Sequence, residues 1–249
     1  MHEYLLLLIY FSIGLLAGLM TGIFGIGGGS IRTPLLNLAG LPLITSFGIN
    51  LFTIPFSCGI GAFSHRKNIN YQIAIYMIIG GILGSVFGAL IAFYLSFNPL
   101  ILAIIFVIVS ILTVIGLNLY KMAPNFSLKI KASPPIVTGG ALILNTITGM
   151  RGGSGGSLFP PFLRTLNLKM HEAIATSLFT AIFTALVAVG LYWNRGNIAW
   201  IPAITVLLGS LVGPPLGSKI SLKTKPRWLE IGLSILVVLL SLITIYKAT

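Results

Sequence analysis

Two arginines lie deep in apolar sequence, where charged residues are rare. Arg32 and Arg151 each stand within a glycine-rich cluster, at residues 21–34 and 148–161, and neither cluster contains an acidic residue. Charged residues at membrane depth are costly and usually serve function. An anionic ligand would be a suitable partner, because a guanidinium offers an oxyanion several hydrogen bonds. The alternative is that each arginine snorkels to an interface or caps the carbonyls of a broken helix.

The glycine clusters supply the second part of this chemistry. Glycines that break a helix inside a bilayer must face protein or a watery cavity, because lipid cannot satisfy the exposed backbone. A half-helix that starts there points free amides and the positive end of its dipole into the site, and binds anions without a metal or cofactor. The residues predicted to bind substrate are Gly27, Gly28, Gly29, Ser30, Arg32, Asn50, Thr53, Arg151, Gly153, Ser154, Gly155, Gly156, Ser157, Ser177 and Thr180.

Several of these residues have an equally good structural explanation. Asn50 and Thr53 lie one helical turn apart, as do Ser177 and Thr180. These side chains either hydrogen-bond a substrate oxygen or bond to neighbouring helices and their own carbonyls. The serines of the glycine clusters stand where serine is also a common N-cap.

The composition is that of an integral membrane protein. Of the 249 residues, 56% are hydrophobic and only 7% are charged, whereas soluble domains carry about a quarter charged residues. The net charge of +12 comes from basic residues in short loops between apolar spans. It therefore indicates orientation in the bilayer rather than nucleic-acid binding. The alternative is that these residues form a basic rim that attracts anions. We expect an all-α, multi-pass membrane protein.

The acidic and sulfur-containing residues argue against an enzyme. Glu3, Glu172 and Glu230 are the only acids, and none lies in the middle of an apolar span. The three histidines lie apart near span ends, and Cys58 is the single cysteine. We find no nucleophile–base pair and no metal-ligand cluster, so no catalytic residue, metal or cofactor is predicted.

The chain divides into two halves of similar pattern. We predict a first repeat at residues 1–120, a basic linker at 121–135 and a second repeat at 136–249. Each half is predicted to contain a long helix, a glycine break, a short helix and three spans. The expected helices cover residues 4–24, 31–39, 41–63, 71–95, 99–120, 136–150, 158–166, 170–193, 198–220 and 228–246.

The halves also match residue by residue. At an offset of 127, residues 21–53 and 148–180 share 12 of 33 residues without a gap. Each half also carries glycines at four-residue spacing, a pattern that lets two helices approach closely. Packing, rather than ligand binding, is the expected role of these glycines, which are Gly80, Gly84 and Gly88 in the first half and Gly209, Gly213 and Gly217 in the second.

Basic residues indicate how the halves are oriented. If each glycine break turns the chain back as a re-entrant hairpin, eleven basic residues fall in the cytoplasm and two outside. If each broken helix crosses instead, the division is seven to six. The positive-inside rule favours the first arrangement. It gives two inverted repeats, a cytoplasmic linker and both termini outside. The first helix, at about 21 residues, is nevertheless long enough to span.

At its glycine turns the sequence resembles the sulfite exporter TauE/SafE family of membrane transporters. The resemblance is carried by residues 25–30 with Pro34, by residues 149–156 with Pro161, by the duplication and by the basic linker. It implies transport of small sulfur-containing or organic anions such as sulfite, sulfoacetate and related sulfonates. Ser154 stands where the first half has Gly27, so the two half-sites are unequal.

These observations predict a secondary transporter, an exporter, that moves a small anion across the cytoplasmic membrane by alternating access. Paired broken helices in two halves are the best sequence indication of such a site. An anion channel or uniporter on the same scaffold is the alternative. The sequence leaves open the exact substrate, the direction of transport, the coupling ion (H⁺ or Na⁺) and the oligomeric state.

Overall fold

A computed structural model describes residues 2–24, 28–122, 132–154 and 158–223. These residues form helices joined by short loops, and none of them lies in a strand. The last expected span, at residues 228–246, lies outside them, as does most of the linker. Five of the helices are long and apolar enough to cross a membrane. The expected fold class, an all-helical membrane protein, is confirmed.

The helices begin and end close to their predicted positions. The elements are α1 (His2–Phe24), α2 (Gly29–Leu38), α3 (Leu43–Ser64), the 3₁₀ turn η1 (Arg66–Asn68), α4 (Tyr71–Leu95), α5 (Pro99–Met122), α7 (Pro134–Gly149), α8 (Phe159–Thr165), α9 (Met170–Asn194) and α10 (Trp200–Lys223). Local signals explain several starts. Asn70 caps α4 by accepting a hydrogen bond from the Ile73 amide, and prolines occupy the first turn of α7 and α8, where a missing N–H costs nothing.

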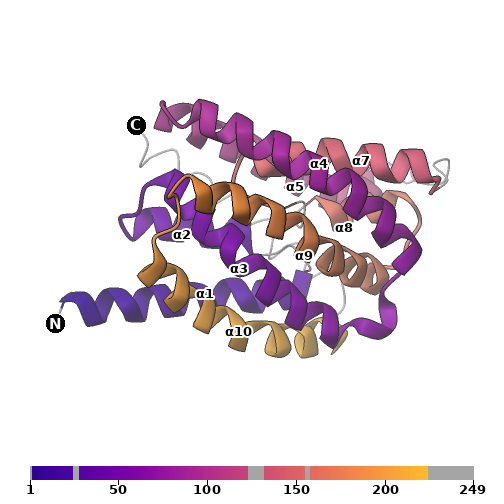
Figure 1. The fold of residues 1–249 in the computed structure, drawn as a ribbon. Helices are drawn as coiled ribbons and strands as arrows, with labels where there is room; N and C mark the ends of the chain where they lie inside the picture. Colours follow the sequence, from indigo (N-terminus) through magenta and orange to yellow (C-terminus); the bar gives the residue numbers. More distant parts are fainter. Residues whose placement is uncertain (1, 25–27, 123–131, 155–157, 224–249) are drawn as a thin grey trace.

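Three pairs of helices build the bundle. The α1/α10 pair and the α4/α7 pair have the most extensive contacts, and α3 packs on α9 between them. Figure 1 shows the α4/α7 pair along the top and the α1/α10 pair along the bottom, with α3 and α9 in the middle layer. The long helix of each half thus packs on a helix of the other half.

Glycines on both partners allow α1 and α10 to touch along their length. Gly14 of α1 lies against the Val206 carbonyl of α10, and Gly22 lies against Pro214. Since both positions increase together, the two helices run in the same direction. A Cβ at Gly217 of α10 would overlap the backbone of α1. The close approach therefore excludes any larger residue at these positions.

The α4/α7 pair repeats this geometry. A Cβ at Gly80 would overlap the carbonyl of Thr138, and one at Gly88 would lie 2.6 Å from the carbonyl oxygen of Thr146. These helices also run parallel to each other. The glycines at four-residue spacing thus mediate helix packing, as expected from the sequence.

The helix ends define two faces of the bundle. His65, which follows α3, contacts the Gly22 carbonyl near the end of α1, and Asn70 contacts Glu172 at the start of α9. The ends of α1, α3 and α10 therefore lie together with the starts of α4 and α9. We call this face the basic end. It carries Arg66, Lys67, Lys169, Lys219 and Lys223.

The first glycine turn folds back along α1. Gly28 has a left-handed backbone (φ 71°). A Cβ added there would lie 2.8 Å from the Ala17 carbonyl oxygen and 2.9 Å from Thr21 Oγ1. The chain has thus returned from the end of α1 to the level of Ala17 before α2 starts. Helix α1 is long enough to span, and a turn back toward its starting face follows it.

The glycine contacts make a stability prediction. Gly80→Ala should lower the melting temperature of the purified protein, because overpacking against a backbone carbonyl typically costs about 1–3 kcal/mol. Gly139→Ala on α7 is the matched control, since a Cβ there meets nothing within 4 Å. Equal melting temperatures for the two variants would contradict the packing role of Gly80.

Candidate functional site

Arg32 lies in the first turns of α2 and is completely buried. Its Nη1 donates to Asn50 Oδ1 at 2.6 Å, and its Nη2 donates to Ser210 Oγ at 3.1 Å. Ser210 in turn donates to the Gly14 carbonyl of α1. The guanidinium is therefore held inside the protein by α3 and α10, and it does not snorkel to an interface.

Asn50 of α3 joins the first glycine turn to the second. While its Oδ1 accepts from Arg32, its Nδ2 donates to the Gly152 carbonyl at 2.7 Å. Both groups of the amide are thereby used, and Asn50 is fully buried. A Cβ at Gly29 would lie 2.5 Å from Asn50 Nδ2, so the amide fits directly against the start of α2.

Arg151 makes the reciprocal connection from the second turn. Its Nη2 donates to Ser30 Oγ at 3.0 Å and its Nη1 to Ser110 Oγ of α5 at 3.3 Å. Its guanidinium also lies 5.5 Å from the centre of the Phe106 ring, within cation–π range. Arg151 is 3% exposed. Each half thus contributes one buried arginine, and each arginine is tied to the other half.

Two bridges therefore connect the glycine turns. Arg151 donates directly to Ser30, and Asn50 of α3 accepts from Arg32 while it donates to Gly152. Gly152 can take this place because it has a left-handed backbone (φ 67°) and no side chain to collide with Phe47. The start of α2, the described part of the second glycine turn and two arginines therefore lie close together in the bundle. The arrangement is suited to an oxyanion, because amides and guanidinium groups are both donors.

The structure uses the other predicted site residues in different ways. Thr53 donates to the carbonyls of Ile49 and Asn50, which is the structural alternative considered for it. Ser154 donates to the Ala181 carbonyl, placing the second turn beside α9. Thr180 is fully buried, and its hydroxyl has no hydrogen-bond partner among the described residues.

Other predicted residues contribute backbone or lie elsewhere. Ser177 is buried in α9. Gly153 donates its amide to the Thr148 carbonyl at 2.9 Å. Gly28 accepts from the Arg32 amide and caps α2. The predicted contacts Gly27, Gly155, Gly156 and Ser157 lie outside the described residues.

Ser110 and Ser210 were not among the predicted site residues. Each lies on a long apolar helix and hydrogen-bonds an arginine from a distant part of the chain. The only signal in the sequence was a hydroxyl in the middle of a span. Many such hydroxyls bond to their own helix, as Ser57 does, so this signal could not have singled them out.

His65 ties the end of α3 to the end of α1. It is 1% exposed, and its Nε2 lies 3.3 Å from the Gly22 carbonyl oxygen. A carbonyl can only accept, so Nε2 carries the hydrogen. Burial lowers the pKa of His65 below its ordinary value, and nearby His171 lowers it further, although the Gly22 contact opposes the shift. His65 therefore favours its neutral form in the folded protein.

The sequence matches the family described as Sulfite exporter TauE/SafE over residues 10–244. The chain belongs to the sulfite exporter TauE/SafE family. It is 28% identical over 233 residues to the probable membrane transporter protein YjnA of Bacillus subtilis, covering 87% of this chain and 91% of the relative. A probable membrane transporter protein of Methanocaldococcus jannaschii is 28% identical over 256 residues, covering 93% of each chain.

A second Bacillus subtilis relative, the probable membrane transporter protein YdhB, is 28% identical over 214 residues, covering 82% of this chain and 86% of the relative. No solved structure gives a significant match. The TauE/SafE protein is thus a membrane transporter, as the glycine turns and the duplication predicted.

The bridge made by Asn50 predicts a large effect on stability. Asn50→Leu removes an acceptor from a buried guanidinium and a donor from the Gly152 carbonyl. Unsatisfied buried partners of this kind cost about 2 kcal/mol or more. The melting temperature of the transporter in detergent should fall accordingly. Asn37→Leu is the control, because Asn37 makes a half-buried bond within its own turn region. An equal fall in both variants would contradict the bridging role.

The lowered pKa of His65 predicts a loss of stability in acid. The unfolded chain binds a proton near the ordinary pKa of about 6.5, while the folded protein resists protonation. The stabilisation is therefore complete above that pH and is lost as the pH falls below it. His65→Gln, which cannot titrate, should lose less melting temperature between pH 8 and pH 5.5 than the wild type. An identical loss would show that His65 is not responsible.

Proposed function

We propose that this TauE/SafE protein is a secondary transporter that exports a small sulfur-containing or organic oxyanion, such as sulfite or sulfoacetate, across the cytoplasmic membrane. One observation carries the proposal. Arg32 and Arg151, one from each half, are buried beside two glycine turns that hydrogen-bond to each other. The substrate would lie between the turns, in contact with the arginines and the amides of the half-helix starts.

Charge gives this site its preference for anions. The hydrogen bonds described above for both guanidinium groups go to neutral amide, hydroxyl and carbonyl oxygens. The three acidic residues of the chain all lie outside both glycine clusters. An oxyanion would bring the negative charge and accept hydrogen bonds from either arginine. Sulfite and sulfonates have this chemistry.

Inverted repeats are part of the proposal, and the exchange of helices between the halves supports them. Helix α1 packs on α10 as its counterpart α7 packs on α4, and α3 packs on its own counterpart α9. This pattern is expected of two units related by a two-fold axis. The charge count then places the basic end and the linker in the cytoplasm, with the N-terminus and, by the same count, the C-terminus outside.

Transport would follow from the movement of one half against the other. The two bridges between the turns, Asn50 to Gly152 and Arg151 to Ser30, are short enough to hold the site closed in this conformation. An anion that replaces Ser30 as the acceptor for Arg151 would release one bridge. Substrate binding and the opening of the site would thus be linked through a single guanidinium.

Exchange of sulfite in proteoliposomes tests the proposal. Arg32→Gln and Arg151→Gln should each lower sulfite counterflow at least tenfold, because each removes a charge-assisted donor worth about 1.5–3 kcal/mol. Arg164→Gln is the matched control, since Arg164 donates to the Leu168 carbonyl beyond α8. The control should transport at the wild-type rate.

Folding and mechanism need separate readouts. Melting temperatures and gel filtration identify variants that fail to fold. Arg151→Lys keeps the positive charge, so it should retain part of the sulfite flux. Unchanged counterflow in folded Arg32→Gln and Arg151→Gln would refute the site. Saturable counterflow supports a transporter, whereas a current that rises without saturation in a planar bilayer would identify an anion channel.

A further inference from the structure

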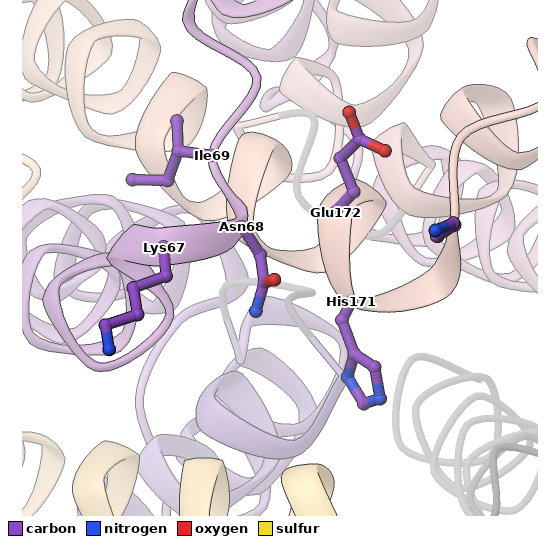
Figure 2. A pocket seen from close by; sticks show the side chains of 6 residues that line it. Lys67, Asn68, Ile69, His171 and Glu172 are labelled. Carbon is purple, nitrogen blue, oxygen red and sulfur yellow. The ribbon is translucent and has the colours of Figure 1, made fainter.

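A cavity of about 330 Å³ lies at the basic end, between the loop that follows α3 and the start of α9. Figure 2 shows it from close by. Its walls come from both halves of the chain. The hydrogen bonds described above for Arg32 and Arg151 involve none of its lining residues. The residues that line it are Lys67, Asn68, Ile69, Lys169, His171 and Glu172.

The lining is rich in groups that bind anions. Lys67 and Lys169 bring two positive charges from opposite halves, against the single carboxylate of Glu172. That carboxylate is partly engaged, because its Oε1 accepts from Asn70 Nδ2 at 2.9 Å. In Figure 2 the Glu172 side chain extends to the side opposite the Asn68 amide and the His171 ring. The cavity thus has an excess of positive charge.

His171 brings an imidazole to the cavity lining, and one of its ring nitrogens is unsatisfied within the described part of the chain. The Nδ1 atom of His171 is buried, and none of the described residues forms a hydrogen bond with it. A buried polar atom usually has a partner. The positive-inside rule requires basic residues on one face of a membrane protein. It does not require two lysines from different halves to share a cavity with a buried imidazole nitrogen and a carboxamide.

The cavity lies close to the central site along the chain. Helix α8 starts just after the second glycine turn and has seven residues, a length of about 10 Å. A short loop that ends at Lys169 follows it, and His171 lies in the first turn of α9. Helix α8 thus lies, along the chain, between the turn that carries Arg151 and the second-half residues that line the cavity.

We propose that this cavity is a second anion-binding site, which captures the cargo at the cytoplasmic face before it reaches the two arginines. The inference rests on the proposed export of a small oxyanion. Lys67 and Lys169 would neutralise a sulfite or sulfonate group, and Asn68 and His171 would hydrogen-bond its oxygens. The site raises the local concentration of substrate at the entrance, so it acts on affinity at one face of the membrane.

Sided transport separates this site from the central one. In vesicles that expose the basic end, Lys67→Gln with Lys169→Gln should raise the apparent KM for sulfite roughly tenfold, as expected for lost charge-assisted contacts. The maximal rate should be unchanged, and so should the KM measured from the opposite face. The matched control is Lys219→Gln with Lys223→Gln, which removes two exposed charges from the same face without touching the cavity.

The outcomes distinguish a specific anion-binding site in the cavity from general attraction by the positive charge of the basic end. A KM raised only by the cavity variant supports the proposal, whereas an equal rise in the control shows attraction by overall charge and overturns it. An unchanged KM also overturns it. If the wild-type protein does not transport sulfite at all, the proposed function is refuted. The cavity proposal, which rests on that function, is refuted with it.

Direct binding covers the case in which the double variant does not fold. Calorimetry with sulfite on full-length Arg151→Gln, whose central site is disabled, should still detect one binding event. Adding His171→Gln to that protein should weaken this binding several-fold. Absence of any sulfite binding to folded Arg151→Gln, or binding that His171→Gln leaves unchanged, would overturn the proposal.

Discussion

The burial of two guanidinium groups inside a helical membrane protein is the constraint on which the rest of the structure depends. Such a charge is tolerated only where its donors find partners. Arg32 and Arg151 find theirs on α3, α10, α5 and α2, and therefore across the two halves. The glycines serve the same requirement, because Gly29 and Gly152 leave room for Asn50 and Phe47 to approach the turns. The arginines thus connect the halves, and they would supply the positive charge of the proposed site.

The paired helices hold this arrangement in place. The α1/α10 and α4/α7 contacts are backbone to backbone along glycine faces, which leaves little freedom for either partner to slide. The turns follow α1 and α7 directly, so each turn is anchored through a helix of the opposite half. A movement that opens the site would then carry each pair as a unit. This expectation agrees with transport by rocking of rigid bodies.

Much of this could be predicted from the sequence, because the information was local. Apolar length and glycine breaks placed the described helices within a few residues, and Gly80 and Gly209 could be assigned to packing from their spacing alone. Arg32 and Arg151 could be singled out as candidates from their apolar surroundings. Their partners did not, because Ser110 and Ser210 are far away in the sequence and resemble any hydroxyl in a span. The bridge from Asn50 to Gly152 depends on a backbone carbonyl. Every residue has one, so the sequence could not indicate which carbonyl Asn50 contacts. The cavity at the basic end was missed for a related reason. Orientation in the bilayer, or a general basic rim, explained its lysines without bringing Lys67 and Lys169 together.

An experimental structure with sulfite bound tests the central claim most directly. The account predicts density for a pyramidal anion between the two glycine turns, with Arg32 or Arg151 within hydrogen-bond distance of its oxygens and Ser30 released from Arg151. A structure at saturating sulfite in which the turns keep both bridges, and the anion lies away from either arginine, would contradict it.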